Sequence, residues 1–399
     1  MNAPLGTTAL VKIITKYMSK GIKTISCKLV TAPYQEQHIE VTMQAFADAC
    51  NYIADVGREH EESAKYKLQK LCYHDVRERF GLSANLTIRA IGRVAPRLKS
   101  KETRRSTFEP TSVDYDQRIF SFRESDWTVS LTLLTSRERF DLDIGDWQRE
   151  ELSGQEPTSA VLCKKRGSYY IDIQVKTDLP EEHESSDTLG VDRGINNICT
   201  LSDGTNYAGD KLNAYREKRY RVRRSLQAKA GKGARTSTRR NCRRLLSTLS
   251  GKERRFQKHI NHEISKDIVE KAKANKQTIV LEDLSGIRQS ARQRKSQRRR
   301  FHSWAFYELE QFIRYKAAFA GVPVMSIDPR YTSQTCHACK HIGTRRGADF
   351  GCESCGYEAE ADVNAARNIA QHGACVSRLE ESSTMSCSLH DGSRPIAKA

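Results

Sequence analysis

The stretch GCESCGYEAEADVNAARNI, residues 351–369, sets two cysteines with metal-ligand spacing close to a single carboxylate. Cys352 and Cys355 are separated by two residues, and Asp362 follows seven residues after the second cysteine, at the start of an alanine-rich helix. A purely structural zinc ribbon does not need a carboxylate as its neighbour. The remaining sequence must therefore explain what brings a metal clip and one acid together.

Two Cys-x2-Cys pairs predict one zinc site. The four cysteines are Cys336, Cys339, Cys352 and Cys355, with twelve residues between the pairs. Zn²⁺ favours four thiolates in a tetrahedron, and this spacing disfavours the alternative of two chance pairs of buried thiols. His337 and His341 are rival ligands, but four cysteines already satisfy the ion. Because no position is left for water, we expect a structural site and not a catalytic one.

Three acids stand at places where carboxylates that bind catalytic Mg²⁺ usually converge, at strand ends and helix starts. Asp192 interrupts the apolar stretch LGVDRG, Glu282 follows the apolar residues of IVLEDL, and Asp362 opens the last helix. Two Mg²⁺ ions bridged by such acids can activate water and stabilise the leaving 3′ oxygen in phosphodiester hydrolysis. Asp283 competes directly with Glu282, and an aspartate at a helix start is commonly only an N-cap. The residues alone leave both interpretations open.

Basic residues are concentrated in the second half of the 399-residue chain, whose formal net charge is +18. Residues 1–190 hold 27 basic and 28 acidic side chains, whereas residues 191–399 hold 40 and 21. Residues 211–260 hold 18 basic side chains and two acidic ones. Such a segment repels itself unless an anion lies against it, and a polyphosphate backbone is the usual anion. We therefore expect a nucleic-acid partner, since a solvated helix face normally mixes both signs.

Cysteine usage and hydropathy predict a soluble intracellular protein. Eight of the twelve cysteines are scattered outside the two pairs, which fits a reducing compartment with one metal site. Cys72 and His74 lack the further ligands that a second site needs. No apolar run approaches the ~20 residues that span a membrane. Lys12 and Lys16 interrupt the N-terminal apolar residues, so this end is a poor signal peptide, and Met18 is an alternative start.

The first half of the chain changes from a strand pattern to a helical one and back. TISCKLV (24–30) is typical of a strand, residues 36–98 of helices, and the short alternating runs from about 107 of further strands. We expect one β-domain with a helical insertion, closed by the acidic linker 180–187.

The second half alternates strands and helices. Two strands are expected in 188–204, basic helices over about 210–274, and a short buried strand at 277–284. Residues 288–300 carry seven basic side chains and no acidic one, which indicates a nucleic-acid-facing loop. A helix at 303–321 leads through a strand to the cysteines and the final helix. The tail from about 373 is expected to be disordered.

Five short motifs, in this order, resemble the TnpB family of RNA-guided nucleases encoded in bacterial and archaeal insertion sequences. The motifs are DRG, LEDL, TSQTCHAC, CESCG and DVNAARN. The resemblance is strong over about 188–371 and only architectural over 20–180, and compact type V CRISPR nucleases share these motifs. It implies an α/β, RNase H-like RuvC nuclease domain with an inserted zinc ribbon. A wedge-type β-barrel with an inserted helical recognition domain would precede it.

The resemblance also implies domain boundaries and roles for the residues. The implied segments are an N-terminal extension (1–19), a wedge β-barrel (20–35 and 107–187), a helical recognition domain (36–106), a RuvC-like nuclease domain (188–332 and 359–372), a zinc-ribbon target-nucleic-acid-binding insert (333–358) and a disordered tail (373–399). The family's catalytic acids map onto Asp192, Glu282 and Asp362, which would hold two Mg²⁺ ions. Its zinc element maps onto the four cysteines and would hold one structural Zn²⁺. Because that element is inserted just before the last acid, the resemblance explains why clip and carboxylate are neighbours.

Two departures from the family pattern stand beside the catalytic positions. Arg193 follows Asp192 where an apolar residue is frequent in relatives. The second knuckle runs CGYEAEADVNAA, without the basic residue that many relatives carry just before the last acid. Neither departure removes a metal ligand, so we expect an active nuclease.

The expected function is RNA-guided, Mg²⁺-dependent cleavage of DNA beside a short adjacent motif at a single RuvC site, with guide–target pairing supplying the specificity. One alternative is a guide-dependent repressor that binds without cutting, whose signature would be a broken acid trio. The other is a transposase that acts on DNA ends without RNA. The expected partners are a guide RNA and double-stranded target DNA, with one or two chains on each guide RNA and no membrane. The expected location is the prokaryotic cytoplasm.

Overall fold

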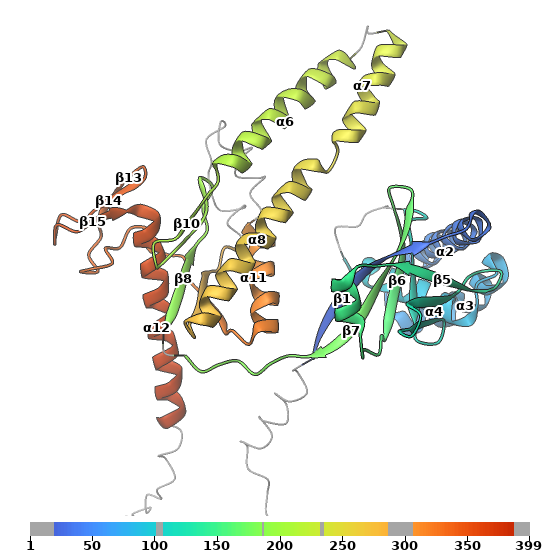
Figure 1. Ribbon diagram of the computed structural model, residues 1–399, viewed down its shortest axis with the longest axis horizontal. Helices are drawn as coiled ribbons and strands as arrows, with labels where there is room; N and C mark the ends of the chain where they lie inside the picture. The colour runs from blue at the N-terminus through green and yellow to red at the C-terminus, as the bar shows by residue number, and fades with distance from the viewer. Residues whose placement is uncertain (1–19, 101–106, 186, 232–234, 286–305, 387–399) are drawn as a thin grey trace, which may run out of the picture. The chain divides into compact units, whose positions relative to one another are not determined.

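The computed structural model describes residues 20–100, 107–185, 187–231, 235–285 and 306–386. These residues form two units, the first ending at Asp178 and the second beginning at Leu179 (Figure 1). The predicted N-terminal extension and the basic loop at 288–300 lie outside the described residues. Among the helices that are described, none is long and apolar enough to cross a membrane.

The first unit is a seven-stranded antiparallel sheet that shares one hydrophobic core with helices α2, α3 and α4 (Figure 1). Its strands are β1 (Lys20–Val30), β2 (Ser112–Asp116), β3 (Phe120–Arg123), β4 (Thr128–Thr132), β5 (Arg137–Asp143), β6 (Ser159–Lys165) and β7 (Ser168–Asp178), in the order β2-β6-β7-β1-β5-β4-β3. Its helices are α2 (Pro33–Glu59), α3 (Lys65–Phe80), α4 (Ala84–Lys99) and α5 (Asp146–Leu152). Helices α2 to α4 lie between β1 and β2 in the chain, as the helical-insertion prediction requires.

Local signals set the ends of these helices. Pro33 occupies the first turn of α2, and the side chain of Gln35 accepts a hydrogen bond from the backbone of Ala32. Helix α3 ends at Gly81, whose φ of 64° suits glycine. No pairing between the edge strands β2 and β3 occurs within the described part of the unit, so the sheet is an open half-barrel. The assignment of this sheet to a wedge-type barrel stays a prediction.

The second unit is built on a five-stranded mixed sheet in the order β10-β9-β8-β11-β12. Its strands are β8 (Thr188–Asp192), β9 (Asn197–Leu201), β10 (Asn206–Ala208), β11 (Thr278–Glu282) and β12 (Val324–Ile327), followed by a small sheet of β13 (Thr344–Arg346), β14 (Asp349–Gly351) and β15 (Glu358–Glu360). Its helices are α6 (Asp210–Lys229), α7 (Thr236–Leu249), α8 (Lys252–Ala274), α11 (Phe306–Ala320) and α12 (Ala361–Ser386). Strands β8, β11 and β12 are parallel, and β9 and β10 are antiparallel to their neighbours.

Strand β11 is buried on both faces, which explains its unbroken apolar run. Ile279 and Leu281 join the core that includes side chains of α8 and α11, whereas Val280 packs with Ile369 of α12. Because side chains alternate along a strand, Glu282 shares the α12 face with Val280. In β8 the same rule places Asp192 on the face of Gly190, which also meets α12.

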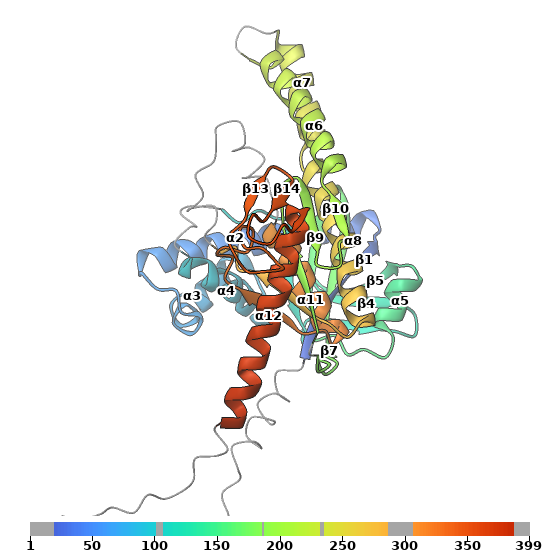
Figure 2. The same ribbon diagram turned by 90° about the vertical axis from the view of Figure 1, so that its left-hand side faces the viewer.

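Helix α12 packs unusually close to the sheet. A Cβ atom built on Gly190 would lie 2.1 Å from the carbonyl oxygen of Ala366, and one on Gly373 would lie 2.4 Å from Val280. The Thr188 hydroxyl donates to the carbonyl of Ala370 at 2.8 Å. The small β13–β15 sheet lies at the N-terminal end of α12 (Figure 2). The helix continues to Ser386, so the tail predicted to be disordered from 373 instead begins as a helix packed on β11.

Gly190 should therefore be intolerant of even a methyl group. We expect Gly190→Ala to lower the free energy of unfolding by about 1–3 kcal/mol, the usual cost of overpacking, because the backbones of β8 and α12 must separate. The matched control is Gly351→Ala in β14, where a Cβ atom meets nothing within 4 Å. Thermal unfolding of both variants tests this, and a Gly190→Ala variant as stable as the control would contradict the close packing.

Candidate active site and cysteine clip

Asp192 and Glu282 end two adjacent parallel strands on the same face of the sheet. The register of β8 and β11 pairs Val191 with Leu281, so the next residue of each strand is an acid. Glu282 is only 7% exposed, and its carboxylate accepts a hydrogen bond of 2.5 Å from the hydroxyl of Thr332. The backbone therefore places the two predicted acids side by side at the carboxyl edge of the sheet.

Asp362 reaches the same edge from the first turn of α12. One of its carboxylate oxygens accepts from the side chain of Asn197 at 2.9 Å, and the other from Arg345 at 2.8 Å. Asn197 lies at the start of β9, and Arg345 lies in β13 of the small sheet. Two segments distant in sequence thus fix the third acid.

The three carboxylates repel one another. The pKa of Asp192 is raised to about 8, first by burial and then by the negative charges of Glu282 and Asp362, while Arg345 and Arg193 act in the opposite direction. This mutual effect shows that the three acids face one region. They are not drawn tightly together, because among the described residues only the four cysteines bring three or more ligand atoms within 4.8 Å of one another.

Burial also raises the pKa of Glu282, and the Thr332 hydroxyl and the charge of Arg193 offset part of the increase. The competing acid, Asp283, is exposed and accepts from the backbone N–H of Ser285 at 2.9 Å, which lowers its pKa. Asp283 therefore caps a turn, while Glu282 faces Asp192.

The four cysteines of the clip meet in the fold. The Sγ atoms of Cys336 and Cys355 are 3.7 Å apart, those of Cys339 and Cys352 are 3.5 Å apart, and all four lie within 4.8 Å of one another. Neither histidine considered as a rival ligand belongs to this group.

Two buried asparagines of α12 connect the clip to the acids. The side chain of Asn364 accepts from the backbone N–H of His337 and donates to the carbonyl of Thr335. Asn368 donates to the carbonyls of Thr332 and Thr335 at 2.9 and 2.7 Å. Thr332 in turn holds Glu282, so the turn before the first knuckle is tied to both α12 and the edge of the sheet.

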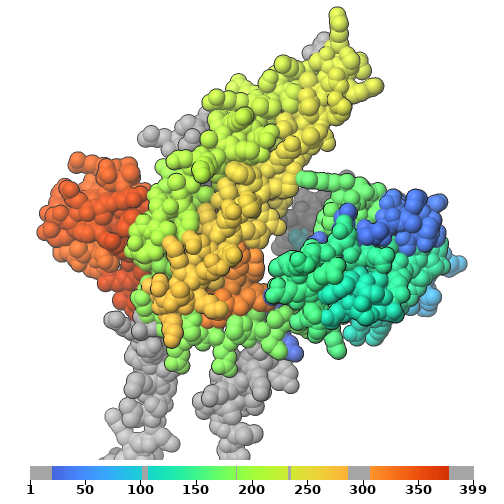
Figure 3. Space-filling view, viewed as in Figure 1, coloured from blue at the N-terminus to red at the C-terminus, as the bar shows by residue number. Residues whose placement is uncertain are grey.

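Helices α6 and α7 and the start of α8 carry the basic run. Helices α6 and α7 lie side by side (Figure 3). Exposed arginines occur on both, and include Arg221, Arg223 and Arg224 of α6 and Arg240, Arg243 and Arg244 of α7. Tyr215 and Phe256 contact each other where α6 and α8 meet, with ring centroids 4.5 Å apart. The arrangement is a strongly basic helical hairpin beside the five-stranded sheet.

Two family models match the chain over these elements. The model described as a probable transposase, OrfB_IS605, matches residues 168–288, and the Cas12f1-like TNB domain model matches residues 306–369. The first range contains Asp192 and Glu282. The second contains Asp362 and all four cysteines.

Relatives with similar sequences carry nuclease or TnpB names. The CRISPR-associated endodeoxyribonuclease Cas12f1 of Sulfoacidibacillus thermotolerans is 44% identical over 36% of this chain and 34% of its own length. The putative RNA-guided DNA endonuclease InsQ of Escherichia coli strain K12 is 30% identical over 55% and 57%. A TnpB-like protein of Methanocaldococcus jannaschii is 26% identical over 60% and 89%. Over these ranges the chain is similar to TnpB-like proteins and to Cas12f1.

A solved structure shares the fold. A solved complex of Cas12f1 with sgRNA and target DNA is similar with a TM-score of 0.62 and 16% identity, over 92% of this chain and 86% of that one. At this identity the likeness concerns the fold alone. In sequence, the chain spans between about a third and two thirds of the length of the first three relatives it matches.

Several residues of the candidate site carry no local signal in the sequence. The basic partner of Asp362 is Arg345, seventeen residues upstream of it, and not a residue just before the acid. Thr332 and Asn197 reach the acids across 50 and 165 residues. The sequence signal for these residues is limited to the motifs TSQTCHAC, which contains Thr332, and DVNAARN, which contains Asp362. A hydrogen bond between distant segments produces no periodic pattern in the sequence.

The raised pKa of Asp192 predicts how stability depends on pH in the absence of added Mg²⁺. Between the usual aspartate pKa of about 3.9 and the value of about 8 in the fold, Asp192 carries a proton in the folded state but not in the unfolded state. Protonation of Asp192 therefore stabilises the fold. The stabilisation is complete below the usual pKa and is lost as the pH rises through about 8. Asp192→Asn avoids that loss. The unfolding temperature of this variant, measured by calorimetry relative to wild type, should rise from pH 6 to pH 9. A difference between variant and wild type that stays constant over this range would contradict the repulsion among the three acids.

Proposed function

We propose that this chain is an RNA-guided DNA endonuclease with a single RuvC-like centre at Asp192, Glu282 and Asp362. The observation that carries the proposal is the meeting of these acids at one edge of the five-stranded sheet, where adjacent parallel strands end in Asp192 and Glu282. The strand order, with three antiparallel strands leading into parallel ones, supports an RNase H-like assignment. Names of relatives, which include RNA-guided DNA endonuclease, support the reaction class.

The acids suit Mg²⁺, which takes oxygen ligands from carboxylates. Their mutual repulsion, visible in the raised pKa of Asp192, is what a bound cation would relieve. When bound, Mg²⁺ would activate the attacking water and stabilise the leaving 3′ oxygen, with two ions expected. Thr332 would keep the Glu282 carboxylate turned toward Asp192. Arg345 offers a guanidinium at the same edge, a group suited to contacting a phosphate.

The four cysteines fit one structural Zn²⁺. Tetrahedral coordination with Zn–S distances of about 2.3 Å places sulfurs roughly 3.8 Å apart, and the observed separations of 3.5 and 3.7 Å are close to this. Four thiolates leave no position for water, so the clip would organise the turn that carries Thr332 and the strand that carries Arg345.

The basic hairpin is proposed to bind the guide RNA paired to its target strand. Arginines spread over α6 and α7 suit contact with phosphates along a duplex more than reading of bases. Sequence specificity would then come from base pairing, with a short motif beside the double-stranded target read by the first unit. The proposed location is the prokaryotic cytoplasm, because a nuclease of this kind needs access to cellular DNA.

The probable-transposase description of one family model keeps a second candidate in view. A transposase would act on DNA ends without RNA, so guide dependence separates the two. A repressor that binds without cutting is less well supported, since all three acids are present and face one region.

Substitution of Glu282 and, separately, of the adjacent Asp283 tests the catalytic assignment. Glu282→Gln should lower guide-dependent cleavage by more than the roughly 100-fold that partners of metal ligands usually cost, as should Asp192→Ala. Both should still bind guide RNA. Asp283→Asn is the matched control, because Asp283 is exposed and caps a turn, and it should cut like wild type. Equal loss in Asp283→Asn and Glu282→Gln would remove Glu282 from its role.

Zinc content tests the clip. We expect one zinc ion per chain by elemental analysis, and a large loss of zinc in Cys339→Ser. Cys375→Ser is the control, because Cys375 is exposed and lies outside the four-cysteine group. Cleavage should fall together with zinc, since the asparagine contacts join the clip to Thr332. Full zinc content in Cys339→Ser would contradict the ligand set.

A further inference from the structure

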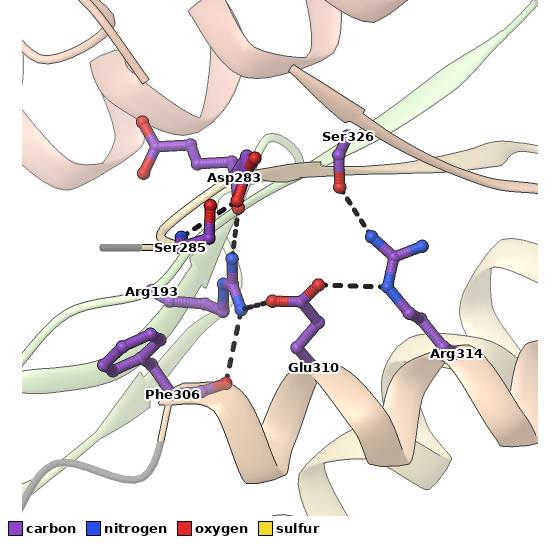
Figure 4. A network of polar contacts seen from close by, with 8 residues as sticks. Arg193, Asp283, Ser285, Phe306, Glu310, Arg314 and Ser326 are labelled. Carbon is purple, nitrogen blue, oxygen red and sulfur yellow. Dashed lines mark hydrogen bonds and ion pairs between the residues drawn. The ribbon is translucent and has the colours of Figure 1, made fainter. Parts of the chain in front are cut away.

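Arg193, the residue after the first acid, is buried inside the second unit. Its side chain is 0% exposed, and its guanidinium donates to three acceptors (Figure 4). These are the backbone carbonyl of Glu282, the carbonyl of Phe306 at 3.2 Å and the carboxylate of Glu310 at 2.7 Å. A buried guanidinium is costly unless it is paired and hydrogen-bonded, so these contacts need an explanation.

The contact with the Glu282 carbonyl stands where the sheet stops. The pairing of β8 with β11 ends at Val191 and Leu281. Beyond it, the next carbonyl of β11 accepts from the Arg193 side chain in place of a strand partner. Because buried carbonyls require a donor, Arg193 continues the connection between the two strands by one further residue. That residue is Glu282.

The other side of the guanidinium is anchored to rigid elements. Glu310 of α11 also accepts from Arg314 at 3.0 Å, and Arg314 donates to the Ser326 hydroxyl of β12 at 2.6 Å. The chain of contacts therefore runs from Arg193 through α11 to β12, which itself pairs with β11. Figure 4 shows Arg193 between the end of β11 and the start of α11. Such an anchored partner can hold a backbone position within narrow limits.

We propose that Arg193 is a positioning residue that fixes Glu282 against Asp192, so that the two carboxylates can share a divalent cation. The inference rests on the proposed function, because it assigns the pair to metal binding. Arg193 touches only the backbone of Glu282 and is followed in the chain by the loop between β8 and β9. It acts through Glu282 and not on the substrate.

Three roles for Arg193 give different results when its charge is removed. If it acted only through its positive charge, a neutral residue would tighten cation binding, since a repelling charge would be lost. If it only stabilised the fold, the unfolding temperature would fall while cation affinity stayed constant. If it positions Glu282, cation affinity falls even though the repelling charge is gone.

The experiment titrates Mn²⁺, as a probe for Mg²⁺, into the zinc-loaded full-length protein by calorimetry. Asp192→Asn identifies the part of the signal that belongs to the acids. Arg193→Met would leave the buried charge of Glu310 paired with Arg314 alone, so the double variant Arg193→Met with Glu310→Gln removes both buried charges together. Arg193→Lys keeps the charge but reaches fewer acceptors. Unfolding temperatures of all variants are recorded in parallel.

We expect the Kd for Mn²⁺ to rise about tenfold in the double variant, the scale seen when partners of metal ligands are removed. The Kd of Arg193→Lys for Mn²⁺ should lie between those of the double variant and wild type. Unchanged or tighter Mn²⁺ binding in the folded double variant would overturn the inference, as would a wild type that binds no Mn²⁺ through Asp192. If wild type binds Mn²⁺ through Asp192 but cuts no DNA with a guide, the proposed function fails while the role of Arg193 stands.

Discussion

The close approach of α12 to strands β8 and β11 is the constraint on which the second unit depends. Gly190 gives the helix backbone room to touch the strand, and Gly373 does the same beside Val280. The contact brings Asp362 to the edge where Asp192 and Glu282 end their strands. It also carries Asn364 and Asn368 to the turn before the cysteine clip. One packing interface thus assembles the acids and links them to the clip.

This assembly stores electrostatic repulsion that the protein offsets only in part. Burial and neighbouring carboxylates raise the pKa of Asp192 to about 8. Arg345 balances Asp362 from the small sheet, and Arg193 lies behind Glu282. The remaining negative charge would attract a divalent cation to this edge. The exposed arginines of the basic hairpin would attract the phosphates of a nucleic acid.

Sequence patterns predicted the parts of the site that depend on local order. One such part is the apolar run that ends in an acid, which forms strand β11. Another is the spacing of the four cysteines, whose sulfur atoms meet in the fold. The contacts of Arg345 and Thr332 depend on how distant segments pack, so no periodicity reported them. For the same reason the final helix was expected to end near 372, although its packing on β11 continues to Gly373.

The most direct test of the account is to purify the protein and sequence the RNA that accompanies it. The account predicts a discrete structured RNA with a variable end, and cleavage of DNA that matches this end. An RNA end that matches the flank of the gene would indicate an insertion-sequence nuclease, and CRISPR repeats would indicate a type V nuclease. Random fragments or no RNA at all, with cutting that ignores added guides, would contradict RNA-guided cleavage.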